Sequence, residues 1–134
     1  MAKFSIDFNE VALTEYLRTP DGPIGRDMER RAINVVALAK LNASGRPGPN
    51  VDTGRLRSSI DSDLEVGPEG LRAVITADVE YASFVELGTE PHLILPRDKQ
   101  ALFWTGADYP VALVHHPGSR PYPFLKPALQ AAIV

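Results

Sequence analysis

The pattern of hydrophobic and polar positions predicts a strand and two helices in the first part of the chain. Residues 4–8 alternate between apolar and polar side chains, as in a short strand with one buried face. The apolar members are Phe4, Ile6 and Phe8. Asn9 can cap a short amphipathic helix over 10–18. The residues that this helix should bury are Leu13, Tyr16 and Leu17. Helical spacing of apolar residues over 24–41 then predicts one long helix that begins near Pro23.

The next part of the chain contains the strongest loop signal. Residues 42–50 include two glycines and two prolines, which predicts an exposed, flexible loop. After this loop, Asp52 or Thr53 can cap one or two turns of helix that reach Ser58.

Alternating residues further along predict a hairpin and a short helix. Residues 60–66 and 71–79 have the pattern of two antiparallel strands that turn at 67–70. A helix over 81–87 follows, and Gly88 can end it in the left-handed conformation.

The remaining elements define the expected fold class. Short strands around 92–95, 101–105 and 111–115 should complete the sheet, the last two flanking a turn at 106–110, and 124–133 should form a closing helix. Strands and helices occur without regular β-α-β alternation. The expected fold is therefore α+β, with a mostly antiparallel sheet packed against the long helix and the closing helix.

The composition is that of one soluble domain: 134 residues, 44% hydrophobic and 23% charged. We therefore expect residues 1–134 to form a single domain, with the flexible loop at 42–50 and a Pro-rich arm at 117–124. No apolar run approaches the ~20 residues that span a bilayer, and the first residues lack the apolar stretch of a signal peptide. We expect no membrane contact and a chain that stays in the cytoplasm where it is made.

Charge and cysteine content exclude several function classes. The chain has no cysteine, so disulfides, thiolate nucleophiles, iron–sulfur clusters and Cys-ligated zinc are excluded. A net charge of −3, without any block of like charges, is not typical of a protein that reads nucleic acid.

The triplet Asp52-Thr53-Gly54 is the sharpest candidate for catalysis. Aspartic proteases bring two such Asp residues together, and a chain with one copy would have to form a homodimer. In those enzymes the triplet ends an apolar strand, whereas here it follows a Gly/Pro loop and precedes Arg55. A helix cap fits the pattern better.

The three histidines do not predict a metal site. His115 and His116 are neighbours and point to opposite faces of an extended chain, and His92 is distant in sequence. Neither a nucleophile elbow nor a phosphate-binding glycine pattern occurs. The sequence predicts no catalytic, cofactor-binding or metal-binding residues.

The segment 116–124 is rich in proline, with Tyr, Phe and Arg between the prolines. Prolines reduce the entropy lost when a segment is ordered against a partner, and these other residue types often anchor interfaces. A loop packed on its own domain explains the composition equally well.

Three sequence blocks, taken together, resemble a known family. The blocks are VDTGRLRSSI at 51–60, VEYASFVELGTEPHLILP at 79–96 and HPGSRPYPFLKPAL at 116–129. Their order and spacing resemble the tailed-phage minor tail-component family, the small neck or tail-completion proteins of siphophages. The long helix before them also has its counterpart there, whereas the length of the Gly/Pro stretch before Val51 departs from the family pattern.

The resemblance implies a structural virion protein and not an enzyme. In that family, an α+β subunit forms a ring of six copies at the head–tail junction, assembled in the host cytoplasm. The ring connects head-closure or adaptor proteins to the tail terminator or tail tube, and DNA passes through its lumen without sequence-specific binding. Alternatives are a tail-terminator ring, a head-closure (stopper) ring and, from another class, the homodimeric aspartic protease.

The resemblance also implies structural roles for the matched residues. Asp52 and Thr53 would act as a helix cap, and Gly54 and Gly88 would hold special backbone conformations. The expected core residues are Tyr81, Phe84 and Val85. The other matched positions, which include the ordered arm from Pro117 to Phe124, are Glu86, Thr89, His116, Pro117, Gly118, Pro123, Phe124 and Pro127.

Overall fold

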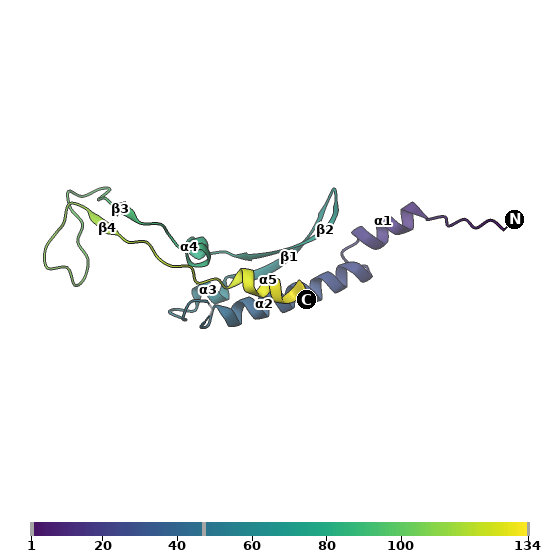
Figure 1. Ribbon diagram of the computed structural model, residues 1–134, viewed down its shortest axis with the longest axis horizontal. Helices are drawn as coiled ribbons and strands as arrows, with labels where there is room; N and C mark the ends of the chain where they lie inside the picture. Colours follow the sequence, from purple (N-terminus) through teal and green to yellow (C-terminus); the bar gives the residue numbers. More distant parts are fainter. Residues whose placement is uncertain (1, 47, 134) are drawn as a thin grey trace.

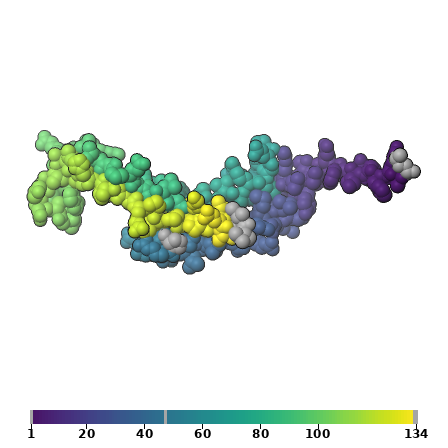
Figure 2. All heavy atoms as spheres, viewed as in Figure 1, coloured from purple at the N-terminus to yellow at the C-terminus, as the bar shows by residue number. Residues whose placement is uncertain are grey.

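The computed structural model describes residues 2–46 and 48–133 of a strongly elongated molecule. A central body of helices and one hairpin carries a helix with an extended N-terminal segment at one end and a thin two-stranded arm at the other (Figure 1). Figure 2 shows a narrow projection at the N-terminal end, in purple, and a broader lobe at the end of the arm, in green. The elements are α1 (Glu10–Arg18), α2 (Pro23–Asn42), α3 (Arg55–Ser58), β1 (Ile60–Gly67), β2 (Gly70–Ala77), α4 (Ala82–Leu87), β3 (His92–Ile94), β4 (Val114–His116) and α5 (Leu125–Ile133).

Helix α2 is the spine of the body and confirms the predicted long helix. Pro23 occupies its first turn, where the missing N–H has no helical partner to lose. Small and β-branched residues face inward along one side, and the hairpin and α5 both pack on this helix. The core cluster comprises Val35, Ala39, Ala43, Ile60, Ala82, Phe124 and Ala128.

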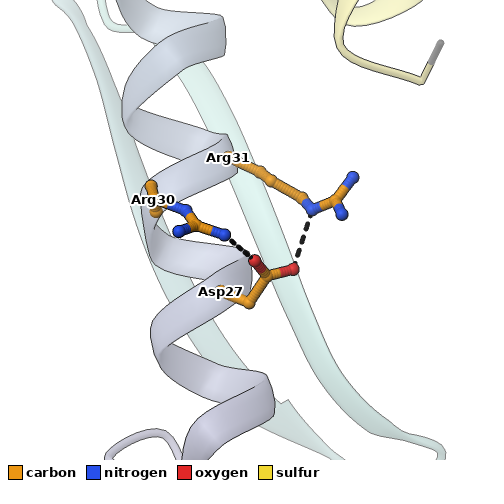
Figure 3. Close-up of polar contacts among 3 residues, drawn as sticks. All are labelled: Asp27, Arg30 and Arg31. Atoms are coloured by element: carbon orange, nitrogen blue, oxygen red, sulfur yellow. Dashed lines mark hydrogen bonds and ion pairs between the residues drawn. The ribbon is translucent and has the colours of Figure 1, made fainter.

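The polar side of α2 carries a local ion-pair group (Figure 3). The Asp27 carboxylate accepts hydrogen bonds from Arg31 Nε at 2.8 Å and from the Arg30 guanidinium. The hydrogen bond from Arg31 is the main cause that lowers the pKa of Asp27, with Arg30 adding to it. Because the two arginine side chains are well exposed and Asp27 is only half-buried, this group supports the helix only locally.

Strands β1 and β2 form the predicted antiparallel hairpin. Ile60 pairs with Ala77 at its base and Gly67 with Gly70 at its turn. The side chains on one face pack toward α2, as Ile60 and Ile75 do. The opposite face is polar and carries Asp61, Asp63, Glu65, Arg72 and Thr76.

The strand predicted over 4–8 is wrong, and so is the predicted burial of the following helix. Helix α1 does begin after Asn9, whose side chain accepts the Ala12 N–H at 3.1 Å. However, residues 2–9 lie outside any strand, and none of the α1 residues is buried. The physical reason is that an amphipathic pattern requires an apolar partner, and α1 directs the N-terminal segment away from the body (Figure 1).

The predicted single sheet is also wrong, although the α+β class holds. The described strands form two separate two-stranded sheets, β1 with β2 and β3 with β4. Residues 101–105 form no strand and contribute only the isolated bridge between Leu102 and Val111. The helix α4 and the extended chain after it separate the two hairpins, so their edges do not meet (Figure 1).

The loop predicted over 42–50 is partly packed. Asn42 belongs to α2, and Gly48 is buried so tightly that an added Cβ would lie 2.3 Å from the Asn42 carbonyl oxygen. The Arg46 guanidinium lies over the Tyr122 ring, 4.5 Å from its centre. Pro47 lies outside the described residues.

Candidate assembly surfaces

Glu86 joins the second and third sequence blocks. Its carboxylate accepts the backbone N–H groups of Phe124, Leu125 and Lys126 at 2.8, 3.0 and 2.9 Å. These are the groups at the start of a helix that lack helical partners, and Pro127, the next residue, has no N–H. One side chain of α4 therefore completes the N-terminus of α5, where a negative charge is also favoured by the helix dipole.

A short ladder of backbone hydrogen bonds joins the segment that follows α4 to the segment that precedes α5. Thr89 and Ser119 exchange two backbone hydrogen bonds at 2.9 and 3.0 Å, and their hydroxyl groups lie 3.0 Å apart. The Tyr122 N–H donates to the Val85 carbonyl at 2.8 Å. These bonds fix the root of the arm to the body.

Two glycines make this close contact geometrically feasible. Gly88 has φ 74°, as the predicted positive φ required, but its ψ of 179° differs from the expected left-handed helical conformation. A Cβ at Gly88 would lie 2.5 Å from the Ser119 carbonyl oxygen. Gly118 has φ 82°, and a Cβ there would lie 2.3 Å from the Thr89 carbonyl oxygen.

The first block forms a turn and not a carboxylate cap. Gly54, with φ 79°, is itself the N-cap of α3, and Thr53 Oγ1 accepts the Arg55 N–H at 3.3 Å. Asp52 is exposed and makes no cap contact with the described residues, so its predicted capping role is wrong. Since Gly54 occupies the cap position, Asp52 lies too early in the turn to reach the free N–H groups.

Asp52 lines a small open pocket of about 180 Å³ between the start of α3 and α4. Among the described residues that line it, Asp52 supplies the one carboxylate, and Arg55 and Arg57 lie on the same rim. In aspartic proteases an apolar strand precedes the triplet. Here no strand precedes it, and the short helix α3 follows it.

The three residues predicted as core around α4 differ in their surroundings. Val85 packs against the core cluster, to which α4 contributes the buried Ala82. Tyr81 is half-buried. Phe84 is 58% exposed, so its predicted core role is wrong. The helix has only six residues, so few of its side chains can face the body, and Phe84 instead lines an open hollow together with Thr89 and His116 at the root of the arm.

The arm begins where two histidines face each other. His92 and His116 are direct partners of β3 and β4, and their rings stack with centres 4.8 Å apart. The His116 Nδ1 accepts the Gly118 N–H at 3.0 Å. No group of three metal-ligating side chains occurs within residues 2–46 and 48–133.

The arm carries many exposed apolar side chains. Beyond the bridge of Leu102 and Val111, the chain forms an irregular tip. The exposed residues are Leu93, Ile94, Leu95, Phe103, Trp104, Tyr109 and Leu113. The sequence predicted strands here but gave no sign that both faces would be free of the body.

The opposite end of the molecule is equally apolar. Phe4, Ile6 and Phe8 are 94%, 83% and 74% exposed. On α1, the residues exposed to solvent include Val11, Leu13, Tyr16 and Leu17. Arg18 ties this helix to the hairpin turn through a 2.8 Å hydrogen bond to the Pro68 carbonyl.

The accessible surface of the chain is much larger than that of a compact monomer. It measures 10577 Å², whereas a globular protein of 14.6 kDa exposes about 6,900 Å². Apolar surface left open at both ends is typical of a chain whose fold is completed by other subunits. No helix in the described parts of the chain is long and apolar enough to cross a membrane.

Exposed apolar residues at both ends are the main surface features of this chain. Residues 24–88, from the start of α2 to the glycine after α4, match a family model described as "Bacteriophage HK97-gp10, putative tail-component". Over these residues, just under half of the chain, the protein is similar to the HK97-gp10-like family, and this similarity supports a structural role related to the phage tail. No curated protein and no solved structure matches the chain. The third sequence block, 116–129, lies beyond the matched residues.

Proposed function

We propose that the protein is a neck or tail-completion subunit that forms a ring of six copies at the head–tail junction. The ring joins head-closure or adaptor proteins to the tail terminator or tail tube, and the genome passes through its lumen. The observation that carries this proposal is the elongated shape with exposed apolar residues at both ends. A subunit in a closed ring needs two different contact surfaces, one for each neighbour.

The charge distribution supports a conduit. The outward face of the β1–β2 hairpin carries Asp61, Asp63 and Glu65, with Arg72 as its one basic residue. The net charge of the whole chain is −3. Such a surface repels the phosphate backbone, so DNA would slide past without being held.

A tail-terminator or head-closure ring is the closest alternative, because it requires the same kind of subunit. The three roles differ in what remains when the protein is missing. Loss of a neck subunit leaves filled heads and finished tails that do not join. Loss of a terminator gives tails of irregular length, and loss of a stopper gives heads that leak DNA.

The test is a phage deleted for this chain and complemented with the intact protein as control. Electron microscopy of the lysate should show separate filled heads and tails of normal length. A cryo-EM map of the complemented particle should place a ring of this chain between head and tail. Normal joined particles without the chain, or its density at the distal tail end, would contradict the proposal.

A further inference from the structure

The hairpin of β1 and β2 has two edges that no strand of the described chain covers. The sheet contains two strands only, so the outward N–H and C=O groups of each strand are free to pair with another strand. Half-buried Ala73 and Ile75 extend the apolar face of the hairpin to the free edge of β2. A two-stranded hairpin is marginal by itself, and a third strand would extend its apolar layer.

The N-terminal segment has the properties of the missing strand. Residues 3–9 form no helix, and Phe4, Ile6 and Phe8, which alternate with polar residues and would share one face of a strand, are all largely exposed. Its own hairpin is out of reach, because α1 carries the segment away from β2 (Figure 1). If one copy supplies this strand to another copy, the free edge of β2 is paired and the apolar face of the N-terminal segment is covered.

We propose that residues 3–9 of one copy add as an edge strand to β2 of a neighbouring copy, antiparallel to it. Pairing Ser5 with Val74 places Phe4 opposite Ile75, Ile6 opposite Ala73 and Phe8 opposite Leu71. All of these side chains then lie on the face toward α2, because alternate residues of a strand share a face. A shift by one residue would turn every apolar side chain to the polar face.

Charge selects β2 rather than β1 as the receiving edge. The polar face of β1 carries Asp61, Asp63 and Glu65, and such charges discourage pairing at an edge. The polar face of β2 carries Arg72 as its one charged residue. In the proposed register Asp7 lies opposite Arg72, which attracts it, whereas beside β1 it would meet like charges.

The inference rests on the proposed function, because a strand given to one neighbour and received from another is a head-to-tail contact. Such contacts produce a ring when the rotation closes. A reciprocal exchange between two copies would instead produce a dimer. The experiment below separates these outcomes.

The chain lacks cysteine, so an introduced pair reports proximity without background. Ser5→Cys combined with Val74→Cys should form a disulfide under mild oxidation, because directly paired strand residues have the Cα separation that a disulfide requires. The matched control is Ser5→Cys with Asp63→Cys, since Asp63 is paired with Val74 on the other edge of the hairpin. Both pairs are tested in phage particles and in the purified chain at high concentration.

Non-reducing gels should show a ladder of covalent multimers for the Val74 pair and almost none for the Asp63 pair. Covalent dimers alone would support strand addition and overturn the ring. Equal or stronger cross-linking of the Asp63 pair would overturn the choice of edge. Two outcomes would overturn the strand addition and leave the ring proposal intact. One is particles with normal neck density but no cross-link, and the other is a disulfide formed within a single copy.

A second pair of variants tests the apolar face without cysteines. Ile6→Asp should reduce incorporation into particles about tenfold or more, because it places a charge among buried residues. Ser5→Asp adds the same charge on the polar face and should leave incorporation nearly unchanged. The melting temperature of the free chain should stay the same in both, since both side chains are exposed there. Equal losses from the two variants would contradict the proposed orientation of the strand.

Discussion

At the scale of single residues, the junction between arm and body depends on Glu86. Its carboxylate is bound by three backbone N–H groups of another element, and it holds the fully buried Phe124 in place. Hydrogen bonds to a charged group contribute more than neutral ones. The nearby packing of Phe124 makes the contact cooperative with the core.

Replacing this carboxylate should therefore destabilise the whole subunit. Glu86→Ala should lower the free energy of unfolding by about 2–3 kcal/mol, because it removes a cap and leaves half-buried donors without partners. Urea unfolding measures the change, with Glu29→Ala on the exposed side of α2 as control. Loss of less than about 0.5 kcal/mol would show that water replaces the carboxylate at this helix end.

The close approach at Gly88 makes a second residue-scale prediction. Gly88→Ala combines a positive φ with a steric clash, whereas Gly106→Ala has a positive φ of 96° in open space. The Gly106 variant should lose about 1 kcal/mol and the Gly88 variant at least about 1 kcal/mol more. Thermal or urea unfolding of the two variants isolates the clash. Equal losses would mean that the backbone yields around Gly88 at little cost.

Asp52 should prove dispensable for stability and carry no chemistry. Because Gly54 and Thr53 form the start of α3, Asp52→Ala should change the free energy of unfolding by less than about 0.5 kcal/mol. Asp52→Asn should abolish no hydrolytic activity. A peptidase assay across acidic pH checks this, and activity that disappears in the Asn variant would favour the homodimeric protease.

At the scale of elements, the loop after α2 is packed more closely than its sequence indicates, and the two-stranded arm of β3 and β4 is packed less closely. The Gly/Pro-rich loop has Gly48 buried against α2 and Arg46 stacked on Tyr122, whereas the arm beyond β3 touches little of the body. Local opening is easiest where few contacts hold the backbone. The arm tip is therefore the more accessible segment.

Limited digestion with subtilisin, a protease of broad specificity, should consequently cut the arm first. Cleavage within residues 96–110 should precede cleavage within residues 43–46, because a protease needs an exposed and locally open chain. Mass spectrometry of the early fragments identifies the order. In assembled particles the arm sites should become protected. Earlier cleavage within residues 43–46 would show that the loop opens more easily than the arm.

At the scale of the whole molecule, the subunit exposes more surface than a compact monomer of the same mass. Both ends of the elongated molecule carry exposed aromatic side chains, among them Phe4 and Phe8 at one end and Phe103 and Trp104 at the other. A chain of this kind should be a monomer or small oligomer in dilute solution and become ordered at its ends on assembly.

Trp104, the single tryptophan of the chain, offers a direct measure of that ordering. It is half exposed near the arm tip in the subunit. Its fluorescence emission should shift to shorter wavelength as concentration rises and light scattering reports larger species, because burial removes water from the indole. Assembly without any shift would show that the arm tip stays outside the subunit contacts.

The sequence by itself determined the elements whose signals are local. The cap at Asn9, the helical spacing of α2, the hairpin of β1 and β2 and the positive φ of Gly88 all follow from residues close together in the chain. The three sequence blocks also indicated the family, because the order of motifs along a chain can be recognised without knowledge of the fold. Local backbone preference is sufficient for such features.

Only the tertiary structure decided which apolar faces are covered and which distant residues meet. Glu86 binds Leu125 across 39 positions, a pairing that no periodicity encodes. The alternation at 4–8 and the apolar side of α1 predicted burial, yet both stay exposed in the subunit. A pattern shows that a face needs an apolar partner, whereas the position of that partner, in the same chain or in the next copy, is fixed by packing over the whole assembly.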